Sequence, residues 1–102
     1  MNSVSLVGQL AEEPQFRENR GEIPECRMRI AVSRHARTGR HEPGVVYLDV
    51  TTFGEEAREC AARLELGSRI ALVGRIDTDE GRSGSGEWEV RQQVLIDQLD
   101  FL

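Results

Sequence analysis

The sequence contains no lysine and few aromatic residues. All 13 basic residues are arginines, and one Trp, one Tyr and three Phe must serve both the core and any surface that stacks on a ligand. No stretch reaches the ~18–20 consecutive apolar residues that a membrane-spanning helix needs. The first residues, MNSVSLVGQL, have neither a basic segment nor a long apolar run, so no export signal is visible. These absences predict a cytoplasmic protein without a membrane span.

Residue types that carry catalysis or hold metals are also scarce. The two histidines, His35 and His41, have no Cys or carboxylate cluster around them, which argues against a metal site. Neither GxGxxG nor GxxxxGK followed by Ser or Thr occurs, so no phosphate-binding loop is indicated. Cys26 and Cys60 form no CxxC pair; we expect buried free thiols, with a disulfide or a reactive thiol as the alternative. The sequence therefore predicts a non-enzymatic protein that needs no cofactor.

The most informative pattern that is present is an alternation with a period of two. It is clearest in CRMRIAVS at residues 26–33, and it indicates a strand with one apolar and one arginine-bearing face. Similar patterns predict strands at residues 4–6, 46–51, 70–76 and 90–96. The residues expected on the apolar faces of these strands are Val4, Leu6, Cys26, Met28, Ile30, Val32, Val46, Leu48, Val50, Ile70, Leu72, Ile76, Val90, Val94 and Ile96. Those expected on the opposite face include Arg27, Arg29, Tyr47, Asp49 and Thr51.

One segment has helical spacing instead. Residues 54–66 carry apolar side chains three and four apart, with glutamates in the first turn and Gly67 after the last, which predicts a helix of three turns. Residues 34–44 read as a basic loop, and the Gly/Ser-rich residues 79–87 as a hairpin tip that does not pack. The length of 102 residues suits one domain. Five strands with a helix between the third and fourth predict an all-β protein, the five-stranded Greek-key barrel called the OB-fold.

The charge is distributed unevenly. The chain carries a net charge of −5, yet seven arginines and only three glutamates lie in residues 17–40, which leaves +4 there and −9 elsewhere. A basic band on an acidic protein is typical of an electrostatic binding groove. The alternative is a solvated arginine-rich face without a ligand.

Residues along the whole chain resemble one family. The opening strand, the end of the second strand, the helix with its exit, the fourth strand and the last two residues are similar to bacterial single-stranded-DNA-binding proteins. The residues that carry the resemblance are Asn2, Val4, Leu6, Gly8, Leu10, Pro14, Arg17, Ile30, Ala31, Val32, Phe53, Gly54, Ala57, Leu64, Gly67, Ser68, Val73, Gly74, Arg75, Ile76, Phe101 and Leu102. The resemblance supports the OB-fold and implies sequence-tolerant binding of single-stranded DNA, by base stacking on aromatics and by arginine–phosphate contacts.

The same resemblance implies which aromatic residues stack on bases. Tyr47 and Phe53 occupy positions where the family presents stacking rings, although a core role for Phe53 is an alternative. Trp88 could replace a missing ring, or it could face the barrel interior or a subunit contact. The family's other stacking positions correspond to residues near Ala36 and Gly81, so two rings are missing.

Several charges also depart from the family pattern. Carboxylates stand where basic residues are usual, which predicts weaker binding that is shifted toward residues 34–40. These carboxylates are Asp49, Glu55, Asp77, Asp79 and Glu80. The sequence also lacks the family's acidic tail, so recruitment of proteins by that route is not expected.

The sequence thus leads to two hypotheses. The first is single-stranded DNA binding in replication, repair or recombination, through Arg27, Arg29, Arg34, His35, Arg37, Arg40, Tyr47, Phe53, Arg75 and Trp88. The second is a degenerate or primosome-type OB domain that acts mainly in protein–protein interaction. Family members usually assemble as dimers or tetramers, and the apolar residues Val4, Leu6 and Val7 would permit such a homo-oligomer. Replication or repair proteins are further possible partners.

Overall fold

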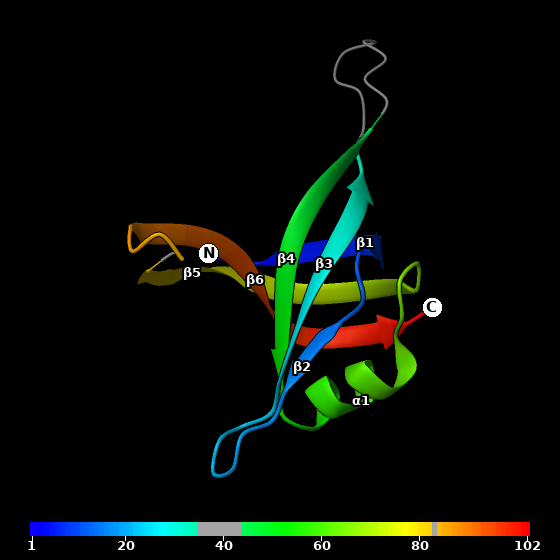
Figure 1. The fold of residues 1–102 in the computed structure, drawn as a ribbon. Coiled ribbons are helices and arrows are strands. Elements are labelled where there is room, and N and C mark those ends of the chain that lie inside the picture. Colours follow the sequence, from blue (N-terminus) through cyan, green and yellow to red (C-terminus); the bar gives the residue numbers. More distant parts are fainter. Residues whose placement is uncertain (35–43, 83) are drawn as a thin grey trace.

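Six strands and one helix make up the part of the chain that the structure describes (Figure 1). This computed structural model describes residues 1–34, 44–82 and 84–102, except for the side chain of Arg82. The elements are β1 (Val4–Leu10), β2 (Gln15–Arg17), β3 (Glu25–Ser33), β4 (Val45–Phe53), α1 (Glu55–Arg63), β5 (Arg69–Arg82) and β6 (Trp88–Phe101).

The strands close into a barrel. Their order in the sheet is β1-β5-β6-β4-β3-β2, and a further pairing of β1 with β3 at Gln9↔Ala31 and Leu10↔Ile30 joins the two sides. The pairing of β4 with β6 is parallel and the others are antiparallel. Helix α1 follows β4 and lies at one end of the ring (Figure 1). The predicted OB-fold is therefore confirmed.

The predicted apolar faces supply most of the core. Every second residue of β3 from Cys26 to Ile30 is buried there, and α1 adds Ala57 and Cys60. The buried apolar residues are Leu10, Cys26, Met28, Ile30, Val50, Ala57, Cys60, Leu64, Ile70, Leu72, Val94 and Leu99. Both cysteines are free and buried, as predicted. Burial is the main cause that raises the pKa of Cys26 to about 11 and the pKa of Cys60 to about 12, so neither thiol is reactive near neutral pH.

Two local elements differ from the prediction. Strand β2 was not expected, because three residues are too few to show a period; it pairs with β3 from Gln15↔Arg27 to Arg17↔Glu25. The helix ends at Arg63 rather than at residue 66, since Leu64 already has an extended backbone. Its first turn begins after Gly54, whose φ of 74° only glycine adopts readily. The glutamates of that turn favour a helix start, as the sequence indicated.

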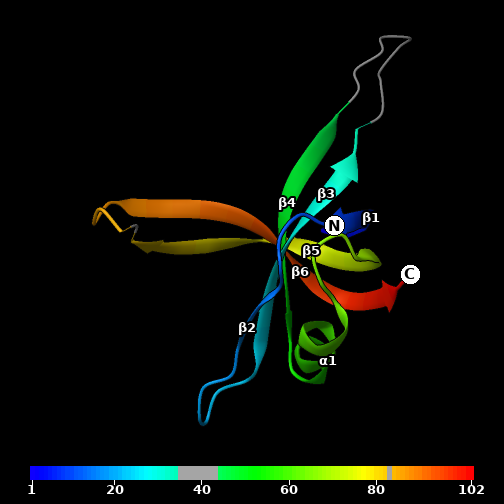
Figure 2. The same ribbon diagram turned by 45° about the vertical axis from the view of Figure 1, so that its right-hand side comes forward.

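The end of β5 and the start of β6 extend away from the barrel as an arm, which Figure 2 shows projecting to the left. We use "arm" for residues 75–94. The register shifts between Val73 and Gly74, where a Cβ on Gly74 would lie 2.2 Å from the carbonyl oxygen of Leu95. The close approach of the β5 and β6 backbones at this point requires glycine. The hairpin tip is also shorter than predicted, because β5 continues to Arg82.

The arm changes where several apolar side chains lie. Ile76 and Val90 were expected on the inward face, and they are exposed because the arm has left the barrel before either can reach the core. At the base of the arm, the Asn2 side chain behaves like an additional peptide group. Its Nδ2 donates to the carbonyl oxygen of Ile76 at 2.8 Å, and the Ile76 N–H donates to Asn2 Oδ1 at 2.9 Å.

Strand β4 is the other place where strict alternation fails. Thr51 was expected to face outward and is buried, because β6 runs alongside β4 and Thr51 Oγ1 donates to Gln93 Oε1 at 2.8 Å. Val46, expected on the inward face, is partly exposed, whereas Leu48 packs against the core. Within the described residues, none of the helical structure is both long and apolar enough to cross a membrane.

Candidate nucleic-acid interface

The outward face of β3 and β4 brings together an aromatic ring, a cation and a carboxylate. The register places Arg29 directly opposite Asp49, and Arg29 Nη1 donates to Asp49 Oδ1 at 3.0 Å. Tyr47 lies two residues before Asp49 on the same face of β4, diagonally across from Arg29. The guanidinium of Arg29 lies over the Tyr47 ring, 5.4 Å from its centre. Asp49 and Tyr47 therefore both hold Arg29, and the ring lies beside a positive charge.

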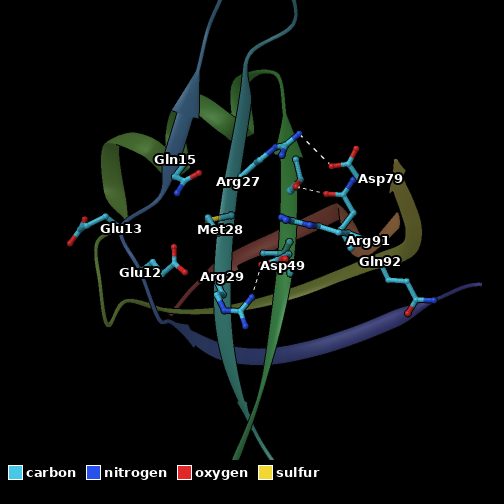
Figure 3. A pocket seen from close by; sticks show the side chains of 13 residues that line it. Glu12, Glu13, Gln15, Arg27, Met28, Arg29, Asp49, Asp79, Arg91 and Gln92 are labelled. Carbon is cyan, nitrogen blue, oxygen red and sulfur yellow. Dashed lines mark hydrogen bonds and ion pairs between the residues drawn. The ribbon is translucent and has the colours of Figure 1, made fainter. Parts of the chain in front are cut away.

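The arm closes one side of a cavity on this face (Figure 3). Asp79 of β5 contacts Arg27 of β3, with 3.7 Å between Oδ2 and Nη2. The hydrogen bond between Thr51 and Gln93 is a second link to the arm, and it comes from β4. The cavity has a volume of about 260 Å³ and is lined by Glu12, Glu13, Gln15, Arg27, Met28, Arg29, Asp49, Val50, Thr51, Asp79, Arg91, Gln92 and Gln93. It is thus built from the segment after β1, from β3 and β4, and from the arm.

The lining of this cavity is not basic. It holds three arginines and four carboxylates, and the carboxylates are Glu12, Glu13, Asp49 and Asp79. Arg27 also pairs with Glu25 at 3.3 Å, and Arg91 pairs with Glu89 at 2.9 Å. An anion entering the cavity therefore meets cations that already have carboxylate partners.

The three candidate stacking residues are all exposed. Tyr47 is 52% exposed, Phe53 is 46% exposed and Trp88 is 61% exposed. The core position considered for Phe53 and the interior position considered for Trp88 are therefore wrong for this chain. Tyr47 and Phe53 share one face of β4, about 20 Å apart at ~3.4 Å per residue, and the cavity lies between them. Trp88 stands apart from them, at the tip of the arm opposite Arg82.

The remaining predicted residues are dispersed or lie outside the described chain. Arg34 follows the end of β3, where its backbone N–H donates to the carbonyl oxygen of Gly44 at 3.1 Å. Arg75 lies at the base of the arm, where it pairs with Asp97, and it is not part of the cavity. His35, Arg37 and Arg40 are outside the described residues.

Sequence reasoning did not propose Arg91, Gln93 or Thr51 as binding residues, although all three line the cavity. Arg91 and Gln93 alternate with Val90 and Val94, so their common face was visible in the sequence. What the sequence did not show is that this face turns toward β3. Among the described residues there is no group of three or more His, Cys, Asp or Glu side chains that could hold a metal ion.

Comparison with known proteins gives a consistent result. A single-stranded DNA-binding protein of Caldanaerobacter subterraneus subsp. tengcongensis is 28% identical over 102 residues, which cover all of this chain and 68% of that protein. Single-stranded DNA-binding protein 1 of Clostridium acetobutylicum is 25% identical, over all of this chain and 94% of that protein. For single-stranded DNA-binding protein 3 of Listeria innocua the identity is 24%, over all of this chain and 64% of that protein. The profile of the single-strand binding protein family matches residues 1–102, and the chain therefore belongs to that family.

Proposed function

We propose that this protein binds single-stranded DNA without strong sequence preference, as a non-enzymatic binding module. The observation that carries the proposal is the pairing of Tyr47 with Arg29 on the exposed face of β3 and β4. In this proposal a base stacks on the face of the Tyr47 ring that Arg29 does not cover, while Arg29 contacts the neighbouring phosphate. The names of the relatives support the choice of single-stranded DNA as ligand.

The path of the strand follows from where the rings lie. Tyr47 and Phe53 flank the cavity on β4, so a strand crossing this face stacks at both ends and passes the arm between them. Trp88 at the tip of the arm adds a third ring at the outer margin. Arg34 is a further proposed phosphate contact, as are His35, Arg37 and Arg40, which lie outside the described residues.

We also propose that the protein forms a homo-oligomer, as a dimer or tetramer, and acts in the cytoplasm. Strand β1 pairs with β5 from Val4 to Gln9 but with β3 only at Gln9 and Leu10, so one edge of residues 4–8 has no strand partner in the described chain. Val7 and Val73 are exposed beside a hollow of about 320 Å³. Val4 and Leu6 instead pack against the core, so Val7 is the outward member of the predicted apolar set.

A second candidate function is docking to a protein, with replication or repair proteins as possible partners. It is favoured by the carboxylates that pair with Arg27, Arg29 and Arg75. In that case an oligonucleotide fails to bind at low salt, while a protein partner is retained in a pull-down.

Titration of the protein with a long oligo-dT, followed by the fluorescence of Trp88, tests the proposal. Trp88 is the single tryptophan, so the signal has one source. We expect quenching at low salt that is reversed by added salt, because contacts with phosphate release counterions.

Two other outcomes separate the alternatives. Flat fluorescence together with rising anisotropy of a labelled oligonucleotide removes Trp88 from the site and leaves the function standing. If both signals stay flat at low salt, the DNA-binding proposal is wrong and docking to a protein replaces it. Binding that does not change with salt also contradicts the proposed arginine–phosphate contacts.

A further inference from the structure

The arginines at the cavity share one feature: each has a carboxylate partner. Arg29 pairs with Asp49 at 3.0 Å, Arg27 with Glu25 at 3.3 Å and Asp79 at 3.7 Å, and Arg91 with Glu89 at 2.9 Å. Figure 3 shows Asp49 directed toward Arg29 and Asp79 directed toward Arg27, with a dashed line between the members of each pair. Each of the described arginines that line the cavity is therefore paired with a carboxylate.

Two of these carboxylates differ from the others by their origin. Glu25 and Glu89 lie two residues from their arginines on the same strand, so these pairs are local. Asp49 reaches Arg29 from the neighbouring strand, and Asp79 reaches Arg27 from the arm. Asp49 and Asp79 also line the cavity themselves, so they occupy the space that a bound strand would cross.

A phosphate and a carboxylate bind a guanidinium in the same way, by parallel N–H···O bonds. A strand that contacts Arg29 must therefore displace Asp49 or remain beside a like charge. Displacing an exposed ion pair costs little, about 0–1 kcal/mol. The carboxylate stays nearby after the exchange, and its repulsion reduces what each phosphate contact contributes.

We propose that Asp49 and Asp79 restrain nucleic-acid binding at this cavity, by holding the arginines that phosphate would otherwise contact. This inference rests on the proposed function and adds the residues that limit its affinity. The two aspartates act as positioning residues for Arg29 and Arg27. Because of them, fewer phosphates are neutralised than the number of arginines suggests, and stacking on Tyr47 carries a larger share of the binding.

The test compares Asp49→Asn and Asp79→Asn with wild type in oligo-dT titrations over a range of salt concentrations. Asn keeps the shape of Asp and removes its charge. The side chains of Asp49 and Asp79 are 47% and 43% exposed, so the variants are expected to fold normally. For each variant we expect binding about three- to tenfold tighter at low salt, the range for the net gain of one typical hydrogen bond. The slope of log affinity against log salt should steepen by about 0.7 for each additional phosphate neutralised on a single strand.

Glu59→Gln is the matched control. Glu59 pairs with Arg63 at 2.8 Å on α1, is similarly exposed and does not line the cavity, so this variant changes the net charge equally without freeing an arginine of the site. It is expected to bind as wild type does. Arg29→Gln should abolish the gain caused by Asp49→Asn, because no arginine is then available to be freed.

The outcomes distinguish this inference from the proposed function. If wild type binds and Asp49→Asn and Asp79→Asn bind no more tightly, or less tightly, the restraint is wrong and DNA binding stands. If Glu59→Gln tightens binding as much as they do, only net charge matters and the restraint is again wrong. If neither wild type nor the two variants bind oligo-dT at low salt, both proposals are wrong.

Discussion

Replacing Tyr47 by Ala measures how much of the binding depends on a single ring. The side chain is 52% exposed on β4 and makes no contribution to the core, so the variant should retain the stability of wild type to within about 0.5 kcal/mol. A stacked base contributes about 1–3 kcal/mol, which corresponds to a loss of about 5- to 150-fold in affinity.

The assay is the anisotropy of a labelled oligo-dT at one low salt concentration, with thermal unfolding of each variant as the test of folding. Tyr47→Phe keeps the ring and should bind within about twofold of wild type, since the stacking is made by the π-face. Leu66→Ala truncates another exposed apolar side chain, located between α1 and β5, and should not change binding. If Tyr47→Ala binds as tightly as wild type while both controls behave as expected, base stacking on Tyr47 is refuted.

Two predictions concern the barrel itself. Gly74→Ala places a Cβ 2.2 Å from the Leu95 carbonyl oxygen and should lower the free energy of unfolding by about 1–3 kcal/mol in a urea titration. Gly81→Ala is the control, because a Cβ on Gly81 would have nothing within 4 Å, and it should not lower the free energy of unfolding. Equal stability of the two variants would contradict the close approach of the backbones at Gly74. Burial raises the pKa of Cys26 to about 11 and of Cys60 to about 12 from 9.0, so the folded state keeps protons that the unfolded state loses. The free energy of unfolding should therefore fall as pH rises from about 9 to 11, and neither thiol should be alkylated at about pH 8 while the protein is folded; rapid alkylation under those conditions would contradict their burial.

The features predicted correctly from the sequence are those that local periodicity controls. The alternation in β3 placed Cys26, Met28 and Ile30 in the core and Arg27 and Arg29 on the opposite face, as the structure confirms. The helix was predicted because the spacing between apolar residues, which is two in the strands, becomes three and four in residues 54–66. Each of these properties depends on neighbours within a few residues, so the sequence displays it directly.

The features that were missed depend on contacts between distant strands. Thr51 is buried because β6 runs beside β4, and Asp79 reaches Arg27 because the arm turns away from the barrel after Gly74. Alternation assigns a side chain to one face of a strand, but it does not say which other element that face meets. The carboxylate partners of the arginines were for this reason visible as departures from the family pattern, while their contacts were not.

The two hydrogen bonds between the Asn2 side chain and the Ile76 backbone have a mechanical consequence. Six residue steps separate the base of the arm at Ile76↔Val94 from its tip at Arg82↔Trp88, a length of about 20 Å at ~3.3 Å per residue. A force applied at Trp88 therefore acts on the barrel through a long lever. Two features hold the base of the arm in place: the close approach of the Gly74 and Leu95 backbones, and the paired hydrogen bonds of the Asn2 side chain. The angle at which the arm stands over β3 is thus set partly by a residue that is distant in sequence from both.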